Sequence, residues 1–276
     1  MQMNFTVDGN KAATNINNIV AKTTENKIQD LIPYGSLNAH TAMVLVNALY
    51  LKADFEKEFK QIFGGKFYDS KNQSHDVEFL QDQFENLPFY QNDYVKMIRL
   101  PFVDKRIHLY VATRRNLSSN MEAKIDVSDV IHLAFSKNVK FGDKNVDVRL
   151  PKFVMSFTAK EMVRHFQSLN VTDLFDESRA NFRGLFEKSR QRVAVSNIRH
   201  KAYIEVLLSI QVSESGVEAA AASSLELDFR FGGDDVETDA TFYADHQFFF
   251  FITLEHKIRK SKFKSIVFAG QYSTPP

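Results

Sequence analysis

Residues 214–230 read ESGVEAAAASSLELDFR, a stretch with unusually small side chains at its centre. Every second position from Val217 to Phe229 is small or apolar, and the positions between them are small or charged. This period of two is typical of a strand with one buried face. Alanine and glutamate also favour a helix, and the Ser215–Gly216 pair before them is suited to a hairpin turn. The residues alone leave strand, helix and hairpin open.

The segment that precedes this stretch predicts a long strand. From His200 to Val212, apolar side chains recur at every second position, while most positions between them are polar; the apolar ones are Ala202, Ile204, Val206, Leu208, Ile210 and Val212. Such an alternation corresponds to a strand of about 40 Å. The long strand therefore leads directly into residues 214–230.

Hydrophobic periodicity predicts both helices and strands elsewhere. Two helices are expected, at 10–27 and 159–169. Residues 41–51 are apolar on both faces, which is typical of a central buried strand. Further strands are expected at 94–100, 106–113, 146–153, 247–254 and 265–270. Six prolines and no flexible linker favour one compact α+β domain over residues 1–276.

Composition and motifs exclude several classes of function. The chain of 276 residues carries 35 Lys+Arg against 34 Asp+Glu, so it lacks the basic surplus of a non-specific nucleic-acid binder. No apolar stretch is long enough to span a bilayer, so no membrane partner is expected. Cysteine is absent, the eight histidines match no metal-ligand spacing, and no phosphate-binding glycine loop or GxSxG motif occurs. We therefore expect no metal, no cofactor and no enzyme.

ESGVEAAAASS resembles the hinge of the serpin reactive-centre loop, and other stretches agree with this family in the same order along the chain. VLVNALYLKADFEKEF (44–59) is similar to the third strand of the family's main sheet, VDVRLPKF (146–153) to the sixth, HKAYIEV (200–206) to the fifth, and FYADHQFFFFI (242–252) to the C-terminal signature. The resemblance implies a serpin fold with a large mixed main sheet, C-terminal β-sheets and an exposed reactive-centre loop at about 214–241.

A serpin-like chain is expected to inhibit a serine protease by suicide cleavage. The protease cleaves the loop, forms an acyl-enzyme, and is trapped as the hinge inserts into the main sheet as a new strand. The resemblance places the scissile bond at Arg230–Phe231, because Arg230 is the seventeenth residue counted from Glu214 as the first, and an arginine there favours a trypsin-like protease. It assigns the hinge to Glu214, Gly216, Val217, Glu218, Ala219, Ala220, Ala221 and Ala222.

The resemblance also assigns two polar pairs. Asn47 and His200 match a hydrogen-bonded pair, the shutter, which must separate when the sheet opens. Lys152 and Glu214 match an ion pair, the breach, where the loop first enters the sheet. Phe55 stands where the family usually has a tryptophan.

Two departures from the family pattern favour a second interpretation. The strand before the hinge is longer than usual by a block such as Leu207–Val212, and the family's first helices and opening strands have no counterpart. A truncated or non-inhibitory serpin, acting as a binding or structural protein, therefore remains the alternative. Apolar strands without their usual cover are expected to favour self-association through exposed sheet edges. The compartment stays open: the sequence as written indicates the cytoplasm, whereas a longer N-terminus would allow secretion.

Overall fold

The computed structural model describes residues 5–115, 125–152, 154–185, 193–207, 237–259 and 261–275. Its backbone divides into two compact units. Unit 1 comprises residues 1–52 and 154–205, and unit 2 comprises residues 53–153 and 206–276. The single domain expected over 1–276 remains a prediction.

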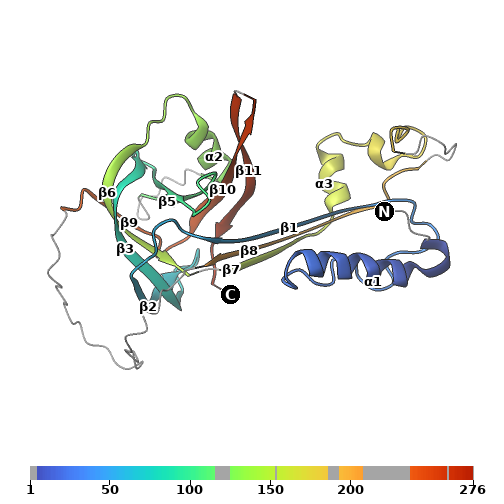
Figure 1. Cartoon of the computed structure of the whole chain (residues 1–276), viewed down its shortest axis with the longest axis horizontal. Helices are drawn as coiled ribbons and strands as arrows, with labels where there is room; N and C mark the ends of the chain where they lie inside the picture. The colour runs from blue at the N-terminus through green and yellow to red at the C-terminus, as the bar shows by residue number, and fades with distance from the viewer. Residues whose placement is uncertain are drawn as a thin grey trace. The chain divides into compact units, whose positions relative to one another are not determined.

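Unit 1 contains a long helix and a small sheet. In its described part, three strands form a sheet in the order β1-β8-β7, and Figure 1 shows α1 running beside them. β1 continues two residues into unit 2. The elements are α1 (Phe5–Thr23), β1 (Val44–Asp54), β7 (Val154–Ala159), α3 (Met162–Ser168), the short 3-10 helix η1 (Asp173–Phe175) and β8 (Asn197–Leu207).

Helix α1 packs against the segment that follows it. Ala12 and Ala13 lie in one buried cluster with Ile32, and Val20 lies in a second with Ile28. The side-chain amide of Asn17 donates to the carbonyl oxygen of Ile32 and accepts from its backbone N–H, both at 2.8 Å. These two bonds satisfy backbone groups that would otherwise be stranded near the core.

Unit 2 is built on a large mixed sheet. Among its described residues, eight strands form this sheet; seven follow the order β11-β10-β5-β4-β3-β6-β9, and β2 pairs with β3. β6 and β9 run parallel, whereas the other pairs are antiparallel. The elements are β2 (Gln61–Tyr68), β3 (Ser74–Gln91), β4 (Val95–Pro101), β5 (Ile107–Arg114), α2 (Val127–Phe135), β6 (Gly142–Pro151), β9 (Ala240–Tyr243), β10 (Phe248–Ile258) and β11 (Ser261–Tyr272).

The phenylalanine run of β10 lies at the centre of unit 2. Residues 248–252 are each at most 2% exposed, as expected for a core strand. Phe251 stacks on Tyr110 of the neighbouring strand β5, with ring centroids 4.4 Å apart. Helix α2 covers this face, because its buried Val130 belongs to the same cluster. Aromatic stacking and burial of apolar area in this cluster both stabilise unit 2.

We predict that Phe251→Ala lowers the free energy of unfolding of unit 2 by roughly 3–5 kcal/mol, because it leaves a large cavity beside Tyr110. Urea unfolding followed by circular dichroism measures this loss. Phe263→Ala is the matched control, since Phe263 lies on the same hairpin but is 46% exposed. Its loss should stay below about 1 kcal/mol. Equal losses in the two variants would contradict the packing described here.

Most expected elements are confirmed, with shifted boundaries. The strands at 94–100, 106–113, 247–254 and 265–270 correspond to β4, β5, β10 and β11. The helix at 10–27 is α1, which ends at Thr23. The helix at 159–169 begins only at Met162, because the residues up to Ala159 form β7.

Two expectations about strands are wrong. β1 is not a central buried strand: it lies at an edge of the three-stranded sheet, and Leu45 and Val46 are 38% and 37% exposed. The stretch 146–153 is not a strand of that sheet either. Through Pro151 it belongs to β6 of the eight-stranded sheet, and β7 takes the place beside β8. The chain changes sheets between Pro151 and Val154, which hydrophobic periodicity does not reveal.

Candidate functional site

Strand β8 is the element from which the predicted reactive loop departs. In the described part of unit 1, β8 lies between β1 and β7 with no other strand between β8 and β1. It pairs with β7 in antiparallel register, from His200 opposite Ala159 to Glu205 opposite Val154. β8 is described to Leu207, and the rest of the predicted strand to Val212 lies outside the described residues.

The predicted reactive loop lies between β8 and β9 along the chain. Residues 208–236 lie outside the described part of the chain. They include the predicted scissile residues Arg230 and Phe231 and every predicted hinge residue: Glu214, Gly216, Val217, Glu218, Ala219, Ala220, Ala221 and Ala222. The candidate site is therefore built from the residues at which this loop leaves and returns.

The predicted shutter residues lie on adjacent strands. Asn47 is an exposed residue of β1, and His200 is a half-buried residue of β8. No hydrogen bond joins their side chains in the described structure, and the buried Nδ1 of His200 has no hydrogen-bond partner there. The ring of Phe157 on β7 lies 6.4 Å from that of His200 between centroids. The pair is thus brought to one sheet, while its role in sheet opening remains a prediction.

A cluster of polar and aromatic side chains holds β8 to its surroundings; we call it the β8 clasp. The Lys27 ammonium lies 2.8 Å from the carboxylate of Glu205 and 5.4 Å from the ring centroid of Tyr203, both on β8. Tyr203 in turn lies 6.1 Å from Tyr50 of β1, and the Tyr50 hydroxyl donates to Glu25 at 3.0 Å. The clasp therefore links β8, β1 and the segment after α1.

Contacts within the clasp raise the pKa values of two of its members, Lys27 and Tyr50. The Glu205 carboxylate raises the pKa of Lys27 above its usual value, which keeps the ammonium charged. Burial, followed by the hydrogen bond to Glu25, raises the pKa of the Tyr50 hydroxyl. Lys201 of β8 makes a further contact with the segment after α1, because its ammonium donates to the backbone carbonyl oxygen of Gln29 at 3.0 Å. Separating β8 from β1 thus requires breaking the aromatic contact as well as the strand pairing.

Lys152, predicted to pair with Glu214, has a different carboxylate beside it. Its ammonium lies 3.1 Å from Glu78 of β3, and its backbone N–H donates to the carbonyl oxygen of the same residue. Both side chains are exposed, so this ion pair contributes little to stability. Since Glu214 lies outside the described residues, the breach pair remains a prediction.

Phe55, which stands where a tryptophan was expected, is buried in unit 2. It is 4% exposed and stacks in parallel on Phe102, with centroids 5.1 Å apart and an interplanar angle of 3°. Phe59 meets it edge-on at 5.5 Å. Phe55 thus packs as a buried aromatic ring between Phe59 and Phe102.

The far end of the loop is fixed by β9. Asp239 donates its backbone N–H to the carbonyl oxygen of Asn145 and accepts the Asn145 N–H on its carboxylate, both at 2.8 Å. From Ala240 to Tyr243 the chain then pairs in parallel with Val146–Arg149 of β6. The return of the loop is therefore held by backbone bonds immediately after residue 238.

Side chains around Tyr243 reinforce this anchor, and we call them the loop-return cluster. The Tyr243 hydroxyl donates to Asp147, which also accepts from the side-chain amide of Gln81 at 2.9 Å. The Arg149 guanidinium lies 4.5 Å from the Tyr243 ring centroid and donates to Gln81. Burial, followed by the hydrogen bond to Asp147, raises the pKa of Tyr243 to about 12.

We predict that one tyrosine titrates near pH 12 in the folded protein and that Tyr243→Phe removes it. Because tyrosine is neutral when protonated, its raised pKa stabilises the folded state fully below pH 10; this contribution is lost as the pH rises towards about 12. Ultraviolet absorbance of tyrosinate measures the titration. Tyr34→Phe is the control, because that side chain is 86% exposed. If Tyr243→Phe removes absorbance that develops near pH 10 instead of near pH 12, the hydrogen bond to Asp147 is contradicted.

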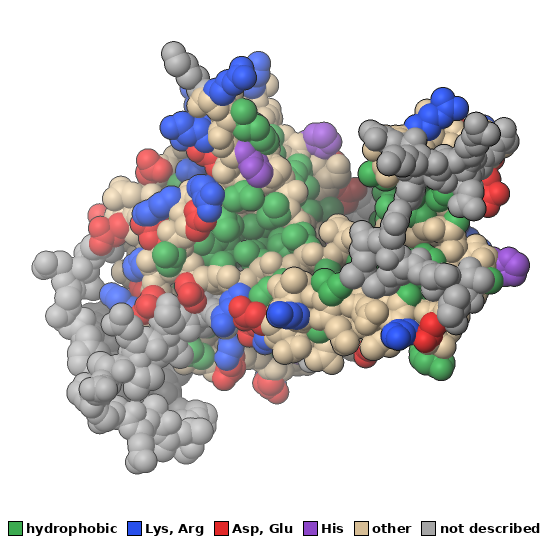
Figure 2. All heavy atoms as spheres, turned by 45° about the vertical axis from the view of Figure 1, so that its right-hand side comes forward, with side chains coloured by type: hydrophobic (Ala, Val, Ile, Leu, Met, Phe, Trp, Pro, Cys, Tyr) green, Lys and Arg blue, Asp and Glu red, His purple; other side chains and the backbone are tan. Residues whose placement is uncertain are grey.

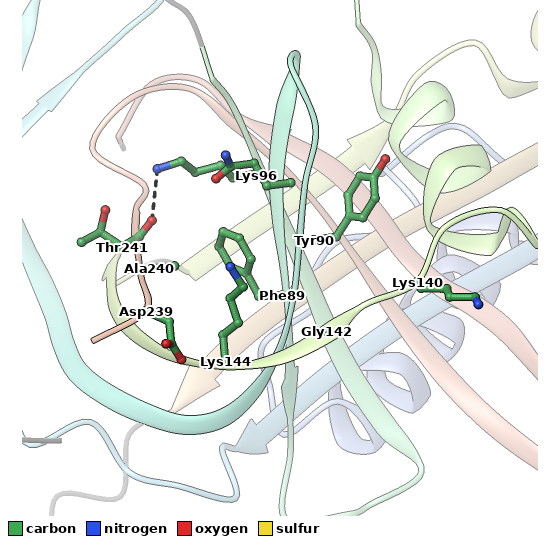
Figure 3. Close-up of a pocket in the computed structure, with 10 residues that line it drawn as sticks. Phe89, Tyr90, Lys96, Lys140, Gly142, Lys144, Asp239, Ala240 and Thr241 are labelled. Carbon is green, nitrogen blue, oxygen red and sulfur yellow. Dashed lines mark hydrogen bonds between the residues drawn. The ribbon is translucent and has the colours of Figure 1, made fainter. Parts of the chain in front are cut away.

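A hollow of about 660 Å³ lies beside the loop return and carries three lysines, Lys96, Lys140 and Lys144. Figure 3 shows that their ammonium groups do not converge. Lys96 donates to the carbonyl oxygen of Thr241 at 3.2 Å, and Lys144 lies over the ring of Phe89 at 5.4 Å. Lys140 points away from both, so the hollow lacks the arrangement of an anion-binding site.

Sequence reasoning did not find the clasp or the loop-return cluster. Glu205 and Tyr203 lie within the quoted stretch HKAYIEV, but their partners Lys27 and Tyr50 are distant in sequence. Tyr243 likewise meets Asp147 only through the pairing of β9 with β6. In the part of the chain that the structure describes, no group of three or more His, Asp or Glu side chains could hold a metal ion. No helix within these same ranges is long and apolar enough to cross a bilayer.

Comparison with known proteins gives a consistent result. The sequence model of one family, Serpin (serine protease inhibitor), matches residues 1–275. The chain is 29% identical to human Serpin B3 over 268 residues, which cover 94% of this chain and 63% of that protein. It is 27% identical to Serpin B6 of Macaca fascicularis, covering 99% of this chain and 68% of that one. The crystal structure of Serpin48 from the insect Tenebrio molitor, described as a highly specific serpin, aligns with a TM-score of 0.71 at 25% identity, over 99% of this chain and 67% of that one.

Proposed function

The chain belongs to the serpin family, and from this premise we propose that it inhibits a serine protease of trypsin-like preference by suicide cleavage of its own loop. The protease serine attacks the carbonyl carbon of Arg230. The Arg230–Phe231 peptide bond breaks, and the amine of Phe231 leaves with a proton from the protease histidine. An ester then joins the protease to Arg230, and insertion of the hinge prevents its hydrolysis.

The observation that carries this proposal is the pairing order of the three-stranded sheet. β8 immediately precedes the proposed loop in the chain. Its neighbour in the sheet is β1, and these two strands must separate for the hinge to insert between them. Tyr50 and Tyr203 make the aromatic contact across this boundary, so the clasp resists spontaneous opening. The four successive alanines at 219–222 have small side chains, so the inserting hinge needs little space between the separated strands.

The loop-return cluster supports the proposed direction of movement. After cleavage, the segment that begins at Phe231 stays attached through Asp239 and β9, whereas the segment that ends at Arg230 is continuous with β8. The segment that carries the protease is therefore the one that follows a strand of the sheet. The covalently bound protease would travel with it.

A second candidate is a non-inhibitory serpin that acts as a binding or structural protein. In the described residues, the sheet that must accept the hinge has three strands, and its edge strand β1 exposes Leu45 and Val46. The chain also spans 63% of the length of Serpin B3. Exposed apolar side chains on an edge strand suit a surface that a binding partner covers.

Incubation with trypsin, followed by denaturing electrophoresis, separates the two candidates. Inhibition predicts a band heavier than either protein that survives SDS, together with a released fragment whose N-terminus is Phe231. Trypsin lacking its nucleophilic serine is the control and should give neither product. Cleavage at Arg230 without the heavy band supports the second candidate and overturns the first.

A further inference from the structure

The free end of the β10–β11 hairpin extends beyond the sheet to which it belongs. β10 pairs with β5 only as far as Leu254 opposite Ile107. Glu255, opposite Lys264 of β11, still donates its backbone N–H to the carbonyl oxygen of Arg106 at 2.8 Å; from His256 to Ile258, the described part of β10 pairs only with β11. Figure 1 shows this end standing clear of the neighbouring strands of unit 2. We call residues 255–259 and 261–264 the hairpin tip.

The hairpin tip concentrates positive charge. It carries four exposed cations and the carboxylate of Glu255, in a chain whose net charge is only +1; the cations are Lys257, Arg259, Lys262 and Lys264. Lys262 lies 2.7 Å from Glu255 and lowers the pKa of that carboxyl. One cation is thus paired, and the others extend into solvent. Figure 2 shows blue side chains gathered at this projecting upper end, with green and purple ones beneath them.

The strand register separates the charges from apolar side chains. Residues opposite each other in an antiparallel pair share a face, so Lys257 and Lys262 lie on one face together with the pair Glu255–Lys264. The other face carries Ile258, and also Phe263 opposite His256. Ile258 is 60% exposed and Phe263 is 46% exposed, although Phe263 stacks on His256 at 4.8 Å.

Protection of the hairpin against pairing with other strands explains the cations of the tip but not its exposed apolar side chains. Lysines on an unpaired ribbon prevent association with other strands, and that role requires charge alone. It does not explain an isoleucine and a phenylalanine left exposed on the same ribbon. Two exposed apolar side chains, flanked by cations at the end of a projecting hairpin, suit a partner that is anionic at its surface and apolar beneath it.

We propose that the hairpin tip docks onto an anionic lipid surface. The lysines and Arg259 would contact the phosphate and carboxylate groups of the headgroups, and Ile258 and Phe263 would enter the boundary of the acyl chains. A nucleic acid or a sulfated polysaccharide satisfies the cations but leaves both apolar side chains in water. This docking would be peripheral, and it is independent of the proposed protease inhibition.

Sedimentation of the full chain with vesicles tests the proposal. Vesicles of phosphatidylcholine with 30% phosphatidylserine should bind the chain, and vesicles of phosphatidylcholine alone should not. The triple variant Lys257→Gln, Lys262→Gln, Lys264→Gln should bind the anionic vesicles at least tenfold more weakly. The double variant Ile258→Ser, Phe263→Ser should also weaken binding, by a factor that added salt does not change, because it removes apolar contact rather than charge.

A matched triple variant controls for net charge. Lys60→Gln, Lys71→Gln and Lys137→Gln remove three exposed lysines from elsewhere on unit 2 and should leave binding unchanged. Thermal unfolding of every variant shows that the fold persists. Equal binding to neutral vesicles, equal loss in both triple variants, or binding to RNA or heparin but not to anionic vesicles would each overturn the proposal.

Discussion

Arg230→Glu is expected to slow inhibition of trypsin by roughly 10²- to 10³-fold. The specificity pocket of a trypsin-like protease holds a buried carboxylate, which pairs with arginine and repels glutamate. Losing one partner of a buried charge pair costs about 2–5 kcal/mol of binding, and each 1.4 kcal/mol corresponds to a tenfold change. The second-order rate of trypsin inactivation, measured with a chromogenic substrate, gives this factor directly.

Arg230→Lys is the matched control for this substitution, because it keeps the positive charge at the same position. Its inactivation rate should fall by less than about tenfold, since lysine still pairs with the pocket carboxylate but without the bidentate geometry of arginine. The fragment released from Arg230→Lys should still begin at Phe231. An unchanged rate in Arg230→Glu would show that the scissile bond lies elsewhere in the loop.

Periodic and apolar signals in the sequence predicted the elements of the fold well. The run Phe248–Phe251 is fully buried as expected, because seven consecutive residues with only one polar side chain leave no face for solvent. The position of β1 was predicted within a few residues, but its burial was not. Apolar residues on both faces indicate that a strand can be covered on both sides; they do not identify the element that covers it.

Helix α2 was not predicted although its start carries a signal. Asp126 and Asp129 form a reciprocal capping box, in which each side chain accepts from the backbone N–H of the other. With only nine residues, this helix shows little more than two turns of periodicity. Its stability comes from Val130 in the core of unit 2, which is a tertiary contact.

The candidate site shows where local patterns stop being informative. Asn47 and His200 were found because a family motif marks them, and the structure places them on adjacent strands. The ion pair of Lys27 with Glu205 has no motif, because its geometry depends on how the segment after α1 passes β8. Contacts between residues far apart in sequence arise from topology, so they become visible only after the strands are paired.

Val217→Asp is expected to convert the chain from an inhibitor into a substrate. If the hinge inserts as a strand, position 217 becomes one of its first buried positions, and an unpaired carboxylate there costs several kcal/mol. Insertion would then be slower than hydrolysis of the ester. Trypsin should cleave Val217→Asp at Arg230 as fast as the original chain, yet the SDS-stable band should disappear.

Two further measurements isolate insertion from cleavage. Val217→Ala keeps a small apolar side chain and should retain the stable band, so it controls for the loss of the valine side chain itself. The original chain, once cleaved, should unfold at a higher temperature than before cleavage, because the inserted strand adds hydrogen bonds and buried area to the sheet of β1 and β8. Cleaved Val217→Asp should show no such rise. A stable band or a raised melting temperature in Val217→Asp would mean that the protease is held by a process other than strand insertion at this position.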